Sequence, residues 1–513
     1  MEHMKKNPPL GMRVQRSVCD KQIVTDVTSE ISLPDYCPEV KRLLRVRATV
    51  MPPEKYLGAS GAQFSGKVEY SVLYAGNDGK LYSLSHADEY RFEVPLELPS
   101  DMELGEGLIC YADSVSESCN GRVAAPRKLT VKCRLHSRVR VWGIQRMEDC
   151  PAESEDVLRL CGNTESAILF LGSHDGLSLG DEIVCDTDSD DLRVASVEGE
   201  VYVTEATAGS GCVTCRGEVF LKLLCTHDEG HTPPTVMLRR IPFQESVETD
   251  GAEVNCNCTA RGICSAINVT VEEGRILCDV TVLLETFAQR NEAVSYTRDA
   301  YSTARHSTCR TERLVLPMAR TCTCANFSLN STLPFKEVGI REGQTVVDLS
   351  LSPTASELSS ENGKDILSGR CRASVILCDD AGELSAQEFD LHFRYEAEGA
   401  SSPVEDYLAD VCCVSCRART DGERIGIDAE LSVLLITRSS NIIERLCECS
   451  FGELYPQKSA SYTVAYPASD DTLWSLAKRY HRSITELAAT NSLPSSPAAD
   501  APDSLDSVHF VLL

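Results

Sequence analysis

Apolar and polar side chains alternate along three similar stretches of the chain. In the first stretch, Val68, Tyr70 and Val72 alternate with polar residues, which is the two-residue period of a β-strand with one buried face. The same alternation occupies residues 219–223 and 371–377. Each stretch opens with a glycine and has a second glycine 13 positions later in a polar segment, so each predicts a β-hairpin. The glycine pairs are Gly66 and Gly79, Gly217 and Gly230, and Gly369 and Gly382.

The regular spacing of these stretches predicts an internal repeat. The opening glycines are 151 residues apart in the first interval and 152 in the second. A second strand-like run follows in each copy, from Lys128, Arg275 and Arg424. We therefore expect a mainly β fold with three tandem antiparallel β domains. The expected divisions are an N-terminal extension at 1–22, β domains at 23–147, 185–300 and 310–447, an irregular connector at 148–184, and a linker at 448–460.

Residues 461–513 have a different pattern, which predicts a strand, two helices and a final strand. Asp471 or Thr472 is placed to cap the first helix, and Ser483 with Glu486 forms a capping box for the second. The first helix has apolar residues at amphipathic spacing: Leu473, Leu476, Ala477 and Tyr480. We expect a small βααβ domain here.

Composition and charge narrow the possible functions. The 513 residues carry a formal net charge of −27, which disfavours nucleic acid or an anionic membrane as a partner. No apolar signal run opens the chain, and no stretch reaches the ~20 apolar residues of a membrane span, so we expect a soluble intracellular protein without membrane insertion. Many of the 25 cysteines lie at apolar strand positions, among them Cys133 and Cys278. Reduced cysteine packs there as a small apolar side chain, which favours a reducing cytoplasm.

Two segments resemble known domains. The block LPDYCPEVKRLLRV at 33–46, followed by GKVEYSVLY from Gly66, resembles the SPOCS domain of clostridial sporulation proteins, and copies two and three match through their strand pairs. Residues 461–513, with YTV, DTLWSLAKRY, SITEL and Asn-x-Leu, resemble a LysM domain. That resemblance implies a binding surface at Asp471, Thr472, Leu473, Asn491, Ser492 and Leu493. If the surface binds a protein, the bulky side chains of Leu473, Trp474 and Leu493 are the expected hot spots.

SPOCS units followed by a LysM domain resemble a family of clostridial spore-coat morphogenesis proteins. The resemblance implies a non-enzymatic scaffold without a cofactor, located in the mother-cell cytoplasm around the forespore. Its LysM domain would bind a protein, the coat ATPase called stage IV sporulation protein A. The alternative is a peptidoglycan-binding protein whose LysM domain holds N-acetylglucosamine glycan. The loop at 494–508 is rich in serine, proline and acidic residues, unlike the family pattern, and this favours the protein partner.

Three fragments imitate catalytic or metal-binding motifs. Residues 61–68, GAQFSGKV, fit a P-loop up to its lysine, but valine replaces the magnesium-binding Ser/Thr and a strand follows instead of a helix. Residues 176–180, GLSLG, match a nucleophile elbow without the helix that it requires. Cys212, Cys215 and Cys225 have zinc-binding chemistry, but Cys215 lies on a strand, where residues i and i+3 point to opposite faces. We predict no catalytic or metal site, and zinc binding by these cysteines stays open.

Overall fold

Strands dominate the computed structural model, and they pair into small antiparallel sheets, so the expectation of a mainly β protein is confirmed. The structure describes residues 11–58, 61–98, 107–148, 156–184, 192–227, 233–272, 274–398, 403–456, 463–468, 471–493, 505 and 508–513. Gly230 and most of the loop at 494–508 lie outside the described residues. No helix within the described ranges is long and apolar enough to cross a membrane.

Three units share one strand topology. When the short β3 (Glu54–Gly58) of unit 1 is left out, each unit has six strands in the same arrangement. The first strand pairs with the sixth and the sixth with the fifth, while the third pairs with the second and the fourth. Unit 1 contains β1 (Gly11–Ser32), β2 (Val40–Val50), β4 (Gly61–Gly76), β5 (Leu81–Val94), β6 (Leu108–Ala125) and β7 (Lys128–Glu148), with the short β3 (Glu54–Gly58) also paired to β4. Unit 2 contains β8 (Val157–Val184), β9 (Leu192–Ala208), β10 (Cys212–His227), β11 (Thr235–Glu248), β12 (Asn257–Glu272) and β13 (Arg275–Ser302). Unit 3 contains β14 (Arg305–Pro334), the short helix α1 (Phe335–Val338), β15 (Thr345–Glu361), β16 (Lys364–Cys378), β17 (Leu384–Glu398), β18 (Asp406–Asp421) and β19 (Arg424–Leu454).

Each unit buries an apolar core between its two sheets. The alternating apolar positions seen in the sequence supply these cores, because one face of each strand points inward. Fully buried examples from the two sheets of each unit are Val72 and Leu135, Leu221 and Val282, and Leu377 and Val433. The periodicity therefore identified strands that are half-buried, with their apolar side facing the opposite sheet.

The repeat glycines occupy matching places in the third strand of each unit. Each lies directly opposite an aromatic residue on the fourth strand, and the aromatic ring covers the glycine. A Cβ atom at Gly66, Gly217 and Gly369 would lie 2.5, 2.7 and 2.1 Å from the Cζ atom of that ring. A side chain at these positions would displace the ring, which explains why glycine recurs at this spacing. The glycine–aromatic pairs are Gly66–Tyr90, Gly217–Phe243 and Gly369–Phe393.

Strands occupy parts of three segments that were expected to lie outside the β domains. The segment 148–184, expected to be irregular, contains the 28-residue strand β8, which pairs with β13 along its length. The expected extension 1–22 contains the first half of β1, and the expected linker 448–460 contains the end of β19. Glycines and polar residues interrupt the alternation in β8, so its pattern resembles that of a loop. Main-chain hydrogen bonds to β13 hold it as a strand, and these leave no periodic signal in the sequence.

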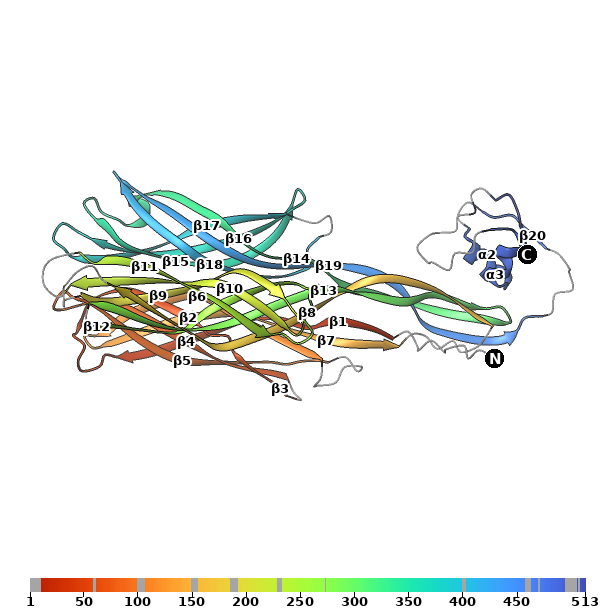
Figure 1. Cartoon of the computed structure of the whole chain (residues 1–513), viewed down its shortest axis with the longest axis horizontal. Helices are drawn as coiled ribbons and strands as arrows, with labels where there is room; N and C mark the ends of the chain where they lie inside the picture. Colours follow the sequence, from red (N-terminus) through yellow and green to blue (C-terminus); the bar gives the residue numbers. More distant parts are fainter. Residues whose placement is uncertain are drawn as a thin grey trace.

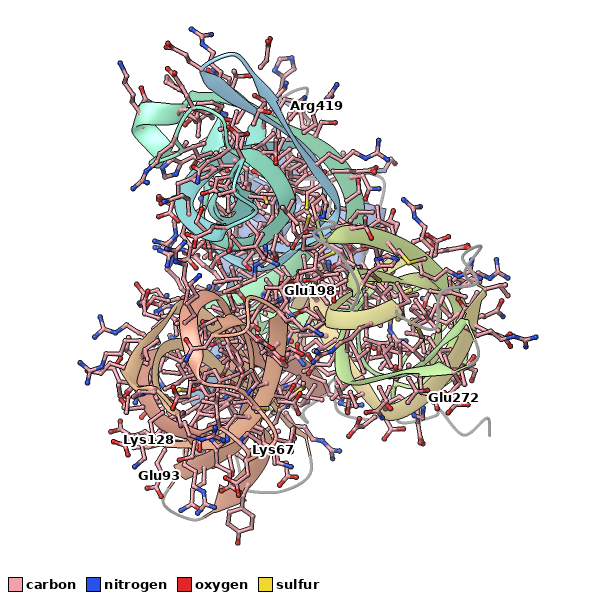
Figure 2. All side chains as sticks on the ribbon, turned by 90° about the vertical axis from the view of Figure 1, so that its left-hand side faces the viewer. Lys67, Glu93, Lys128, Glu198, Glu272 and Arg419 are labelled. Carbon is pink, nitrogen blue, oxygen red and sulfur yellow. The ribbon has the colours of Figure 1, made fainter. Side chains whose placement is uncertain are left out.

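The three units lie side by side around a common axis, seen end-on in Figure 2. Apolar side chains from all three units meet there, for example Leu44, Leu224 and Ile376 in one cluster and Trp142 and Phe287 in another. In Figure 1 the long strands β8, β13, β14 and β19 extend from the body toward the C-terminal module. This module consists of β20 (Val464–Ala465), α2 (Leu473–Tyr480), α3 (Ile484–Thr490) and β21 (Val511–Leu512), with β20 antiparallel to β21.

Candidate functional site

The two helices of the C-terminal module begin differently. Thr472 caps α2: its Oγ1 accepts a hydrogen bond from the Ser475 amide (3.1 Å), and the Ser475 Oγ accepts one from the Thr472 amide (2.9 Å). This reciprocal pair is a capping box that satisfies two free amides of the first turn. Ser483 precedes α3, as expected, but its side chain makes no capping hydrogen bond, so the predicted box with Glu486 is wrong. The Ser483 hydroxyl instead lies 2.7 Å from the hydroxyl of Thr485.

Several residues of the predicted binding surface hold the module together. Asp471 is nearly buried and accepts hydrogen bonds of 2.6 and 3.1 Å from Arg479. This contact with Arg479 is the main reason why the pKa of Asp471 is lowered. Asn491 binds the last strand: its Nδ2 donates to the Leu512 carbonyl and its Oδ1 accepts from the Leu512 amide, both at 2.7 Å.

The remaining predicted residues divide between the core and the helix end. Leu473, an expected hot spot, is 1% exposed and packs with Leu476 in the module core, so it is not a surface contact. Leu493 is partly buried against the same core. Ser492 has a φ of 53°, the left-handed conformation that lets the chain turn away after α3.

Trp474 is engaged by the tip of β13 rather than free at the surface. Its Nε1 donates a hydrogen bond of 2.9 Å to Asp299, and Lys478 lies 2.6 and 2.7 Å from the two oxygens of the same carboxylate. The indole packs edge-on against Tyr301, with ring centroids 4.9 Å apart. The Tyr301 hydroxyl in turn donates to the Arg482 carbonyl at 2.7 Å. We call these residues the docking contact: Asp299, Tyr301, Trp474, Lys478 and Arg482.

A second contact joins the module to the end of β19. The Tyr455 ring stacks on His481, which ends α2, with ring centroids 3.6 Å apart. The His306 ring also packs against Tyr455, with ring centroids 4.3 Å apart. The Tyr455 amide donates to the Ala304 carbonyl at 2.8 Å, which ties this residue to the start of β14. Strands of units 2 and 3 therefore both hold the module.

Another edge of the module is exposed. Tyr466 and Phe510 are 78% and 54% exposed, and Val464 beside them is 46% exposed. Because Ala465 pairs with Val511, Tyr466 and Phe510 occupy the next facing positions, where β20 and β21 diverge. We call these three residues the aromatic edge. None of them belonged to the predicted binding surface, and the aromatic residues beside YTV and in HFVLL are the signal that could have indicated them.

Charged side chains from all three units meet on the common axis. Arg45 of β2 lies 2.8 Å from Glu198 of β9 and 2.5 Å from Asp348 of β15. Lys222 of β10 lies 3.0 Å from each of these carboxylates, and Arg47 lies 3.3 Å from Glu198. We call these five residues the axial ion-pair cluster, and Figure 2 labels Glu198 near the place where the units meet.

The neighbouring positive charges keep Glu198 of the axial ion-pair cluster ionised, as in a structural ion pair. Burial alone would raise the pKa of Glu198, but the charges of Lys222, Arg45 and Arg47 outweigh it and hold that pKa well below its usual range. Glu198 therefore stays ionised and paired at neutral pH. A cleft of about 200 Å³ lies beside the cluster, lined by residues of all three units that include Arg47 and Arg261. Such an arrangement joins the three units through paired charges.

The motif-like fragments lie on strands. Residues 61–68 are part of β4, where Val68 is fully buried, and residues 176–180 are part of β8. Cys215 and Cys225 on β10 are buried in the core of unit 2, while Cys212 is half-buried. Among the described residues, no three Cys, His, Asp or Glu side chains group in a way that could hold a metal ion, and no described cysteine forms a disulfide bond.

Comparison with protein-family models, with curated proteins and with solved structures finds no match to this chain.

Proposed function

We propose that this chain is a non-enzymatic scaffold of spore-coat assembly in the mother-cell cytoplasm. In this proposal the three β units are SPOCS-like, and the C-terminal module is a LysM domain that binds the coat ATPase, stage IV sporulation protein A. The sequence resemblances motivate the assignment. The strand–helix–helix–strand order of the module and the shared strand order of the three units support it.

The observation that carries the proposal is that different side chains of the module hold its structure and remain exposed. Asp471 and Asn491, which the LysM resemblance assigns to binding, make hydrogen bonds within the module, and Trp474, an expected hot spot, is engaged in the docking contact. The aromatic edge stays exposed, with Tyr466 directly after β20 and Phe510 directly before β21. Bulky aromatic side chains of this kind are typical anchors of protein interfaces. A module that is attached to the β units and has an exposed aromatic edge can bind a protein partner while those units stay attached to it.

The test uses the full chain and the purified coat ATPase. Replacing both aromatic residues, Tyr466→Ala with Phe510→Ala, removes the proposed anchors while the buried core stays intact. Truncating a hot spot costs at least ~2 kcal/mol, so we expect affinity to fall at least about thirtyfold in biolayer interferometry. Tyr36→Ala is the matched control, because Tyr36 is 86% exposed on unit 1 and should leave affinity unchanged.

The same proteins distinguish the alternative. Co-sedimentation with purified peptidoglycan should be weak and unaffected by the aromatic substitutions if the partner is a protein. Aromatic rings also stack on sugar rings, so loss of peptidoglycan binding with unchanged binding of the ATPase would establish the glycan-binding function instead. Unchanged binding to both would refute a role for the aromatic edge.

A further inference from the structure

Two cysteines face each other near the start of β14 and the end of β19. Cys309 is the direct cross-strand neighbour of Cys449, and their Sγ atoms are 3.0 Å apart. Directly opposed residues in an antiparallel pair have Cα atoms ~4.5–5.5 Å apart, within the ~4.4–6.8 Å that a disulfide spans. Closing the sulfur separation to the ~2.05 Å of a disulfide bond therefore requires a movement of only about 1 Å.

The surroundings select this pair among neighbouring thiols. Cys309 and Cys449 are half-buried and pack against Ala300 and Leu446, and the Cys309 thiol lies 3.1 Å from the Ala300 carbonyl. Cys447 lies two positions from Cys449 on the same strand, but its thiol is directed to the Arg310 carbonyl at 3.1 Å. Cys449, rather than Cys447, therefore faces Cys309.

The pair also lies where these strands support the C-terminal module. A few residues beyond Cys449, the Tyr455 amide binds the Ala304 carbonyl of the facing segment, and the Tyr455 ring stacks on His481. A covalent bond between β14 and β19 at this place would limit fraying of the strand ends. It would thereby keep Tyr455 beneath the module.

We propose that Cys309 and Cys449 are a thiol–disulfide exchange site whose substrate is a low-molecular-weight disulfide, RSSR. One cysteine thiolate attacks a sulfur of RSSR, forms a mixed disulfide and releases one RS⁻. The second thiolate attacks the protein sulfur of that mixed disulfide and releases the second RS⁻. The two cysteine protons pass to the released thiolates, so two protein thiols and RSSR yield one protein disulfide and two RSH. This site does not depend on the identity of the module's partner.

Incubation of the full chain with mixtures of glutathione disulfide and glutathione, followed by alkylation and mass-spectrometric mapping, tests the chemistry. The Cys309–Cys449 cross-link should form at a lower proportion of glutathione disulfide than a cross-link of either cysteine to Cys447. Cys309→Ser and Cys449→Ser should abolish it, whereas Cys447→Ser, the matched control, should retain it. Cys309→Ala serves as a second variant if the serine variant loses its β-sheet circular dichroism. A cross-link to Cys447 forming first, or stable glutathione adducts without the Cys309–Cys449 cross-link, would overturn the proposal.

Hydrogen exchange of the Tyr455 amide tests the effect on the strand ends. Oxidation should slow its exchange by about tenfold or more, since exchange here requires local opening of the strand ends. The Cys309→Ser chain should show no such change under the same conditions. Equal exchange rates for the cross-linked and reduced protein would refute the idea that the bond holds Tyr455 beneath the module.

Discussion

Asp299 is the residue whose removal best tests how the C-terminal module is attached to the β units. Its carboxylate accepts the Trp474 indole hydrogen bond and pairs with Lys478. The Lys478 side chain is 39% exposed, so solvent screening limits the ion pair to about 1 kcal/mol or less. A hydrogen bond to a charged acceptor contributes about 1.5–3 kcal/mol, so Asp299→Ala should weaken docking by roughly 2–3 kcal/mol. That corresponds to a shift of roughly 30- to 150-fold toward the undocked module, at about 1.4 kcal/mol per tenfold.

Fluorine NMR of the protein labelled with 5-fluorotryptophan measures this shift. The chain has two tryptophans, and Trp142 lies buried in the body, so one of two resonances reports on Trp474. In Asp299→Ala the Trp474 resonance should move toward the position of a solvent-exposed indole, while that of Trp142 stays in place. Lys478→Met is the matched control, because it removes only the ion pair and should shift the equilibrium less than about sixfold. A Trp474 resonance that is the same in Asp299→Ala and the unaltered chain would refute the docking contact.

Two further predictions concern the β units. The lowered pKa of Glu198 means that its pairing stabilises the fold above its unfolded pKa of about 4.3 and that this contribution is lost as pH falls below that value. The free energy of unfolding in urea should therefore change less between pH 7 and pH 3.5 for Glu198→Gln than for the unaltered chain. Glu218→Gln, which removes an exposed ion pair, should keep the full change. The same change in unfolding free energy for all three proteins would contradict the assignment. Gly369→Ala should cost about 1–3 kcal/mol in unfolding free energy because its methyl group would overlap the Phe393 ring. Gly426→Ala, where the nearest atom is 3.8 Å away, should be close to neutral in the same urea titration, and equal losses in the two variants would show that the ring contact is not the cause.

Strands with one buried face were predictable from the sequence. The runs from Lys128, Arg275 and Arg424 are the sixth strands of the three units, and they begin where the alternation begins. Their partners β1 and β8 were missed, because edge strands of a sheet are held by main-chain hydrogen bonds on one side and need no strict alternation. The signal that remains is indirect: a long central strand needs a partner of similar length.

The candidate site was predictable only as local structure. Capping by Thr472 and the burial of Leu476 follow from helical spacing. Asp299, which engages Trp474, is 175 positions away in the sequence. The contact depends on how far the end of β13 extends past the core of unit 2. No local pattern encodes that distance. A tryptophan off the apolar stripe of an amphipathic helix indicates a contact outside the module, but its partner is visible only in the fold.

The axial ion-pair cluster explains why three units of the same topology need not have the same sequence. Unit 1 brings Arg45 and Arg47 to the axis, unit 2 brings Glu198 with Lys222, and unit 3 brings Asp348. Three copies of unit 1 would bring only guanidinium groups together, and burying like charges without partners is strongly unfavourable. Complementary charges therefore favour one arrangement, in which each unit occurs once, over rings made from identical units of separate chains. In each strand taken alone these residues resemble a solvent-facing side, and their burial arises only when the second strands of the three units and β10 of unit 2 converge.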